Sequence, residues 1–159
     1  MKRKLPVFLG FLLLTTFVEL LGGYATSIGV KSWYPFIEKP FFTPPAWVFG
    51  PVWTLLYLQL AIVGSLLYEK ERQVGSRVFL LYFCGLLFNL LWSFLFFALK
   101  NPELACFDLL LLWGITLLSF RPFYRVSKTA CWLYVPYFLW VSFALVLNIA
   151  IVVLNFSKK

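Results

Sequence analysis

The amino-acid sequence contains no histidine and only six acidic residues among 159 positions. Histidine is the commonest general base and metal ligand, so its absence argues against a metal site and against hydrolytic chemistry of the usual kind. Charged residues make up 13% of the chain, about half of the roughly 25% found in soluble domains. Such a chain cannot cover a water-facing surface, which excludes an ordinary soluble fold, and its 62% hydrophobic content excludes disorder.

Cysteine is scarce and shows no functional spacing. Cys84, Cys106 and Cys131 lie far apart in apolar stretches, so we interpret them as packing residues. The net charge of +8 could suggest a nucleic-acid partner. The basic residues, however, form short clusters between apolar runs, which is the pattern of membrane topology signals. We therefore expect no nucleic-acid partner and no resident cofactor.

Long apolar runs define the fold class. Residues 40–68, 78–99 and 129–157 contain no charged residue, and two further runs contain one acid each. A membrane-spanning helix needs about 20 mostly apolar residues, so each run crosses once, and the continuous hydrophobicity excludes a β-barrel. The sequence predicts an all-α protein, a single domain (residues 1–159) that is an integral membrane bundle of five transmembrane helices. The expected spans are 5–28, 46–68, 77–99, 103–121 and 129–156.

The first span has a second interpretation. Lys2-Arg3-Lys4 and the apolar residues after it resemble a signal peptide, whereas Glu19 and Gly22-Gly23-Tyr24 favour a retained helix. With five spans, nine of the 14 Lys and Arg residues lie on the side of the N-terminus. By the positive-inside rule, this bias predicts a multi-pass protein of the bacterial cell membrane with a cytoplasmic N-terminus.

The first connection, residues 29–45, is unusual for a linker. It contains four prolines, which forbid a long helix, and five aromatic residues, too many for a solvated loop. We expect this loop to fold back onto the bundle as a lid.

Polar residues inside the spans are the first candidates for function, because each is costly in lipid. They are Glu19, Gln59, Asn89, Asp108 and Asn148. One interpretation is that they form hydrogen bonds between helices. Another is that some line the polar floor of a ligand cavity, and Asp108 could instead cap the start of its helix.

Deep tryptophans are the second candidates. Trp53, Trp92 and Trp140 lie too far inside their spans for an interfacial belt. Tyr57 shares a helix face with Trp53, while Ala144, Leu147 and Asn148 share one with Trp140. A large ring beside a small residue can form a shelf for a flat apolar ligand, although core packing gives the same pattern. Gly85, Asn89 and Ser93 form a small polar stripe that permits close helix contact, within the bundle or in a homodimer.

Three ordered blocks resemble the TspO/MBR family, which includes tryptophan-rich sensory proteins and the translocator protein, or peripheral-type benzodiazepine receptor. The resemblance extends from about Gly22 to Asn155. The first block is Trp33-Tyr34, Lys39-Pro40, Pro44-Pro45-Ala46-Trp47-Val48-Phe49 and Pro51-Val52-Trp53-Thr54-Leu55-Leu56-Tyr57; the second is Asn89, Trp92-Ser93, Phe96-Phe97, Ala105 and Asp108; the third is Leu133, Pro136-Tyr137, Trp140, Ala144, Leu147-Asn148 and Asn155.

The resemblance implies a five-helix bundle with a cavity beneath the first loop. Members of the family bind porphyrins such as protoporphyrin IX, isoquinoline carboxamides and benzodiazepines. Together with the aromatic pattern, it predicts a ligand-binding set and no metal ligand. The set is Trp33 (in the lid), Phe49, Trp53, Tyr57, Asn89, Trp92, Asp108, Leu111, Trp140, Ala144, Leu147 and Asn148.

These observations favour a membrane receptor or sensor that binds porphyrin and regulates tetrapyrrole levels, with the propionates near Lys31 or Lys39. One alternative is an enzyme that degrades protoporphyrin in light, with Trp53 and Trp140 as the catalytic residues. This chemistry needs no conventional base. The other alternative is a passive transporter of porphyrin or another apolar molecule.

Overall fold

The computed structural model describes residues 4–71 and 76–156, and within them every regular element is helical. Each of the five long helical segments is long and apolar enough to span a membrane, so the predicted all-α membrane bundle is confirmed. In chain order the elements are α1 (Lys4–Gly29), the short 3-10 helix η1 (Tyr34–Phe36), α2 (Ala46–Glu71), α3 (Arg77–Ser93), the π-helix η2 (Phe94–Ala98), α4 (Pro102–Val126) and α5 (Lys128–Phe156).

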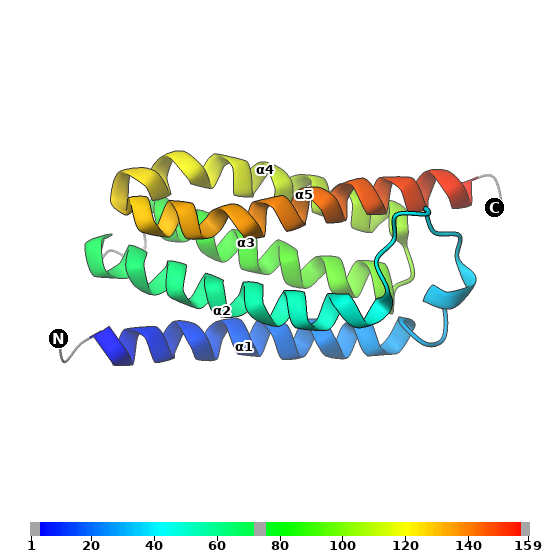
Figure 1. The fold of residues 1–159 in the computed structure, drawn as a ribbon, viewed down its shortest axis with the longest axis horizontal. Coiled ribbons are helices and arrows are strands. Elements are labelled where there is room, and N and C mark those ends of the chain that lie inside the picture. Colours follow the sequence, from blue (N-terminus) through cyan, green and yellow to red (C-terminus); the bar gives the residue numbers. More distant parts are fainter. Residues whose placement is uncertain (1–3, 72–75, 157–159) are drawn as a thin grey trace.

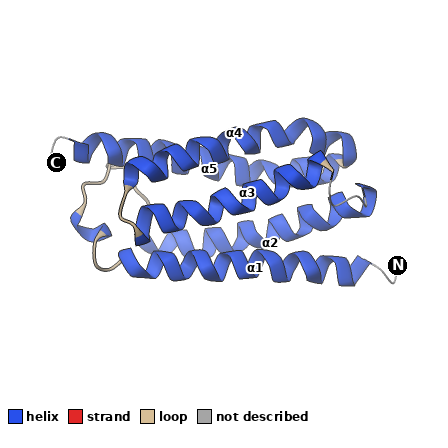
Figure 2. Ribbon diagram, turned by 180° about the vertical axis from the view of Figure 1, so that it is seen from behind, coloured by secondary structure: helices blue, strands red, loops and turns tan. Residues whose placement is uncertain are grey.

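The helices pack side by side along their length (Figures 1 and 2), and their contacts close a ring. Around the ring the order is α1, α2, α5, α4 and α3, and α3 with η2 returns to α1. The two ends of the chain lie at opposite ends of the bundle, as an odd number of crossings requires (Figure 1). The loop between α1 and α2 covers the same end as the C-terminus of α5.

Two helices depart from their predicted ends. We expected Arg121-Pro122 to end the fourth span, but α4 continues through Pro122 to Val126. A proline removes one backbone hydrogen bond, and the helix tolerates that loss near a membrane surface. The third span changes at Phe94 into a π-helix, in which the Leu99 N–H donates to the Phe94 carbonyl five residues earlier (2.8 Å).

The turn after η2 is sharp because of its residues. Lys100 has a positive φ of 53°, which reverses the chain. The Asn101 side chain then accepts a hydrogen bond from the Leu104 N–H (3.0 Å) and caps α4, with Pro102 at the first helical position. The cap is therefore Asn101, and the interpretation of Asp108 as a helix cap is wrong.

The bundle has an apolar core and an equally apolar outside. Leu67, Phe79, Leu112, Phe123 and Val141 are almost fully buried. Leu13, Leu20 and Leu139, among many other large apolar side chains, are more than half exposed. Lipid tails are as apolar as the core, so close packing and internal polar contacts, rather than hydrophobic burial alone, hold these helices together.

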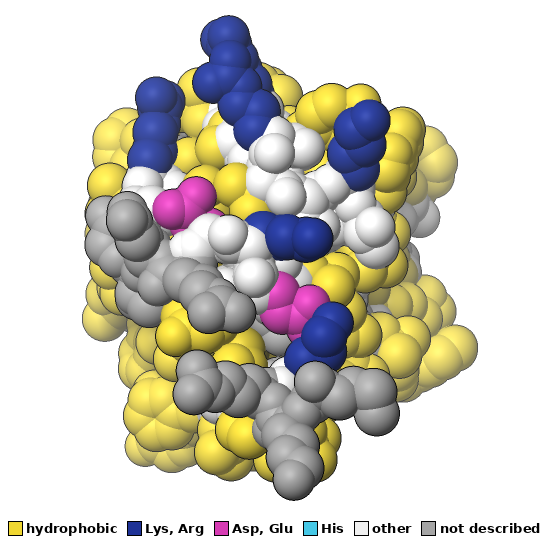
Figure 3. Space-filling view, turned by 90° about the vertical axis from the view of Figure 1, so that its left-hand side faces the viewer, with side chains coloured by type: hydrophobic (Ala, Val, Ile, Leu, Met, Phe, Trp, Pro, Cys, Tyr) yellow, Lys and Arg dark blue, Asp and Glu magenta, His cyan; other side chains and the backbone are white. Residues whose placement is uncertain are grey.

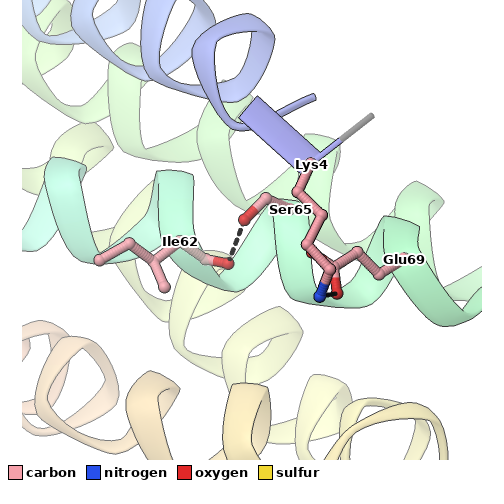
Figure 4. Close-up of polar contacts among 4 residues, drawn as sticks. All are labelled: Lys4, Ile62, Ser65 and Glu69. Atoms are coloured by element: carbon pink, nitrogen blue, oxygen red, sulfur yellow. Dashed lines mark hydrogen bonds and ion pairs between the residues drawn. The ribbon is translucent and has the colours of Figure 1, made fainter. Parts of the chain in front are cut away.

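One end of the bundle carries most of the described positive charge (Figure 3). It combines the start of α1, the end of α2 and the α4–α5 junction, with Lys70, Arg121, Arg125 and Lys128 among its residues. At this end Lys4 of α1 forms an ion pair with Glu69 of α2 (2.8 Å; Figure 4). Nearby, the Ser65 hydroxyl donates to the Ile62 carbonyl within α2 (2.9 Å).

Candidate functional site: an aromatic cavity under the first loop

A cavity of about 280 Å³ lies inside the half of the bundle that the first loop covers. Residues of α1, α2, α3, η2 and α5 line it, and α4 contributes none. This volume is near the lower end of the range of roughly 300–1,000 Å³ for small-molecule pockets. Apolar and aromatic side chains dominate its wall, which suits an apolar guest.

Three tryptophans form the aromatic wall. Trp53 of α2 lies between Trp92 of α3 and Trp140 of α5, with ring centroids 6.4 Å away in each case. The Trp53 and Trp140 planes are nearly perpendicular (86°), so they form a corner rather than a stack. Phe49 contacts Trp140 edge-on at 6.0 Å. The Trp140 Nε1 atom is buried and has no hydrogen-bond partner among the described residues.

Two asparagines form the polar part of the wall. Asn89 of α3 accepts a hydrogen bond from the Tyr57 hydroxyl and donates to the Tyr137 hydroxyl (3.1 Å). Asn148 of α5 accepts from the Trp92 indole N–H (3.0 Å) and donates to the Pro102 carbonyl (2.9 Å). These contacts connect α2, α3, α4 and α5 across the bundle. Both interpretations of the polar residues therefore hold for Asn89 and Asn148, which join helices and line the cavity.

The loop covers the cavity, is hydrogen-bonded to α5, and contains further hydrogen bonds of its own. Asn155 of α5 accepts from the Glu38 N–H (3.0 Å) and donates to the Glu38 carbonyl (2.9 Å). The Lys39 ammonium donates to the carbonyls of Tyr34 and Ile37 (2.8 Å each). Tyr34 lines the cavity, and burial raises the pKa of its phenol above the ordinary value. Lys39 therefore forms hydrogen bonds within the loop, and its expected place beside a ligand carboxylate stays a prediction.

The cavity reaches the surface along α1 and α2. Gly23 and Gly50 both line it and are exposed. A Cβ atom built on either glycine meets no atom within 4 Å. The small residues Ala46 and Thr54 also line the cavity from exposed positions on α2. The cavity therefore opens to the outside of the bundle on this side.

The structure brings most of the predicted ligand-binding residues to this cavity. Those that line it are Phe49, Trp53, Tyr57, Asn89, Trp92, Trp140, Ala144, Leu147 and Asn148. Their role in binding a ligand stays a prediction. What the structure adds is their common location, which the sequence could only suggest.

Three predicted residues do not line the cavity. Trp33 packs edge-on against Phe96 (5.5 Å) beside the cavity, so Tyr34 is the aromatic residue of the loop that faces it. Leu111 is 40% exposed on the outer face of α4. Asp108 is buried (4% exposed), and its Oδ2 has no hydrogen-bond partner in the described part of the chain. Phe96, Leu147 and Ile151 pack together with Ala105 of α4 and also line the cavity, so they lie between α4 and the space.

Several lining residues were absent from the predicted set. Phe96 and Phe97 both reach the cavity from η2, and π-helical turns often occur at functional sites. Their aromatic character could be seen in the sequence, but the π-turn that aims them could not. Glu19 also lines the cavity and accepts a hydrogen bond from the Thr54 hydroxyl. Its charge within an apolar span was the signal that could have placed it in the set.

The polar stripe on α3 serves packing within the chain. Gly85, Asn89 and Ser93 are all buried, and a Cβ on Gly22 of α1 would lie 3.3 Å from the Ser93 Oγ. The other helices of the chain cover these three residues, and a homodimer through helix three stays a prediction.

Comparison with known proteins agrees with this architecture. The family model described as "TspO/MBR family" matches residues 11–154. This chain belongs to the TspO/MBR family. It is 42% identical to the tryptophan-rich protein TspO of Archaeoglobus fulgidus over 138 residues, which cover 87% of this chain and 90% of that protein.

More distant TspO/MBR relatives match along most of the chain as well. The tryptophan-rich sensory protein of Cereibacter sphaeroides is 30% identical over 149 residues, covering 92% of this chain and 93% of the relative. The human translocator protein is 33% identical over 119 residues, which cover 73% of this chain and 70% of that protein. With five helices able to span a membrane, this member of the family is a multi-pass integral membrane protein.

Proposed function

We propose that this TspO/MBR protein is a membrane receptor that binds flat apolar molecules of the porphyrin class in the aromatic cavity and thereby regulates tetrapyrrole levels. The observation that carries the proposal is the corner of Trp53, Trp92 and Trp140 around an internal space. The names of the relatives, a tryptophan-rich sensory protein and a translocator protein, agree with recognition of a small molecule in the membrane.

Stacking and burial would supply the binding energy. Each good contact between aromatic rings contributes about 0.5–1.5 kcal/mol beyond the area that it buries. A planar macrocycle can contact Trp53 or Trp140 by its face and the other ring by its edge, because those planes are nearly perpendicular. The cavity is small for a tetrapyrrole, so part of the macrocycle would extend through the opening beside Gly23 and Gly50.

The test is binding of protoporphyrin IX to the protein in a neutral detergent, measured by the anisotropy of porphyrin fluorescence. Trp53→Ala combined with Trp140→Ala should weaken binding by about tenfold or more, since two ring contacts are lost. Trp132→Ala is the matched control, because Trp132 is 71% exposed outside the cavity. Equal affinities for all three proteins would place the binding site elsewhere.

Light-dependent breakdown of protoporphyrin is the second candidate function. Trp53 and Trp140 both line the cavity, with ring centroids 6.4 Å apart. Indole could then donate an electron to excited porphyrin in the presence of oxygen. Illuminated protoporphyrin should give different products with the wild-type protein and with Trp53→Phe. Identical product patterns in the two samples would leave only ordinary photobleaching.

The charge distribution supports one orientation in the membrane. Lys4, Lys70, Arg77, Arg121, Arg125 and Lys128 lie at the end opposite the cavity, and Lys31, Lys39 and Lys100 lie at the other. By the positive-inside rule, the basic end and the N-terminus face the cytoplasm of a bacterial cell. The lid then faces outward, and a cysteine introduced at exposed Phe41 should react with an impermeant maleimide in intact cells.

A further inference from the structure

The cavity wall contains an acidic residue but no basic residue. Glu19 lines the cavity, and none of the residues that line it is a lysine, an arginine or a histidine. Lys39 of the loop donates to backbone carbonyls of the loop itself. A ligand inside the cavity therefore meets one acid and no base.

Glu19 also has capacity to accept another hydrogen bond. It projects from α1 at the level of Thr54, whose hydroxyl donates to the Glu19 Oε1 atom. The second oxygen, Oε2, has no hydrogen-bond partner within residues 4–71 and 76–156. An acidic side chain inside a membrane span is costly unless a partner satisfies it, and such residues commonly mark ligand or ion sites.

The rest of the wall favours positive charge too. Trp53, Trp92 and Trp140 present indole rings, and indole has the strongest attraction for a cation among the aromatic side chains. Cages of aromatic rings are a common recognition site for ammonium and other organic cations. All three indoles line the same cavity as Glu19.

We propose that the cavity selects flat aromatic ligands that carry a positive charge or a cationic N–H group, and that Glu19 is the residue that determines this selectivity. The inference rests on the proposed function, since it uses the same cavity. It implies that a ligand with carboxylates, such as protoporphyrin, binds with those carboxylates away from the Glu19 side of the cavity. It also predicts that an aromatic amine enters with its nitrogen toward Glu19 Oε2.

A series of three tricyclic probes of nearly equal shape tests the proposal: 9-aminoacridine, which is cationic, acridine, which is neutral, and acridine-9-carboxylate, which is anionic. Binding is measured by equilibrium dialysis at neutral pH in a neutral detergent, with empty micelles as the blank. Wild-type protein should bind 9-aminoacridine about tenfold or more tighter than acridine, as expected for a hydrogen bond to a charged group. Acridine-9-carboxylate should bind most weakly of the three probes.

Glu19→Gln keeps the shape of the side chain and an oxygen that can accept from Thr54, but it removes the charge. This variant should bind 9-aminoacridine about as weakly as acridine. Glu71→Gln is the matched control, because it removes one negative charge from α2 at the opposite end of the bundle. The control should retain the wild-type preference, and protoporphyrin should displace 9-aminoacridine from the wild-type protein.

The outcomes separate the two proposals. Equal binding of all three probes, or a preference that survives Glu19→Gln, overturns the selectivity while protoporphyrin binding still supports the proposed function. Loss of the preference in Glu71→Gln as well would show that the overall charge of the micelle causes it, which also overturns the inference. If neither the probes nor protoporphyrin bind, both proposals fail.

Discussion

The closest backbone contact next to the cavity joins the end of α1 to the π-helix. Gly29 is buried, and a Cβ atom built on it would lie 2.9 Å from the Phe97 carbonyl carbon and closer still to the Phe97 oxygen. Real Cβ atoms essentially never come within 3.0 Å of such an atom. Backbone atoms cannot rotate away as a side chain does, so Gly29→Ala must separate α1 from η2.

The magnitude follows from two opposing terms. Overpacking a closely packed site costs about 1–3 kcal/mol, whereas replacing glycine by alanine within a helix gains up to about 1 kcal/mol. Gly10→Ala isolates the second term, because Gly10 is an exposed residue of α1 and its added Cβ meets no atom within 4 Å. We therefore expect Gly10→Ala to be neutral or slightly stabilising, and the free energy of unfolding of Gly29→Ala to lie about 1–3 kcal/mol below that of Gly10→Ala, because the helix-propensity gain is common to both.

Reversible unfolding of the protein in mixed micelles by added sodium dodecyl sulfate, followed by far-ultraviolet circular dichroism, would measure this difference. Gly29→Ala should also weaken protoporphyrin binding, because Phe97 and Val30, which lies next to Gly29, both line the cavity. If the two alanine variants have the same free energy of unfolding, the close approach of α1 and η2 is not a feature of the folded protein.

Three further substitutions test other parts of the site. Asn89→Leu leaves the buried hydroxyls of Tyr57 and Tyr137 without their partner and should cost about 2–4 kcal/mol in the same unfolding assay; an unchanged free energy of unfolding would contradict the role of this network. Asn155→Ala removes both hydrogen bonds to Glu38, so protease cleavage of the loop should accelerate while unfolding changes by less than about 1 kcal/mol. Gly50→Phe fills open space at the exposed side of the cavity and should slow both association and dissociation of protoporphyrin in stopped-flow experiments; unchanged rates would mean that ligands enter elsewhere.

Fold class could be predicted because hydrocarbon imposes a simple rule. Every backbone polar group in lipid must be satisfied, so long uncharged runs become helices whatever their propensity in water. The clearest miss on helix length, at Pro122, came from treating a proline as a stop signal where α4 continues to Val126. At this position, the low helix propensity of proline was a weaker guide to the end of α4 than the length of the helix.

Some of the cavity residues could be predicted from the sequence, and others could not. The deep tryptophans and Asn89 could be found because indole and amide groups are unusual at the centre of a span. The α4 residues Asp108 and Leu111 do not line the cavity, since periodicity shows which residues share a face but not which neighbour that face meets. Residues of η2 became visible as part of the wall only once the helices were packed, whereas Glu19 was already a candidate because it is a charged residue within a span.

By itself, the amino-acid sequence determined that the chain spans a membrane as helices and that aromatic and amide side chains lie deep within it, because these depend on composition and distance along one helix. Only the tertiary structure decided that α1, α2, α3, η2 and α5 enclose a space while α4 does not. The same packing placed Glu19 in the wall without a basic residue beside it. The reason is that a cavity and its charge are properties of several helices packed together, and the relative rotation of those helices is not encoded in the periodicity of any one of them.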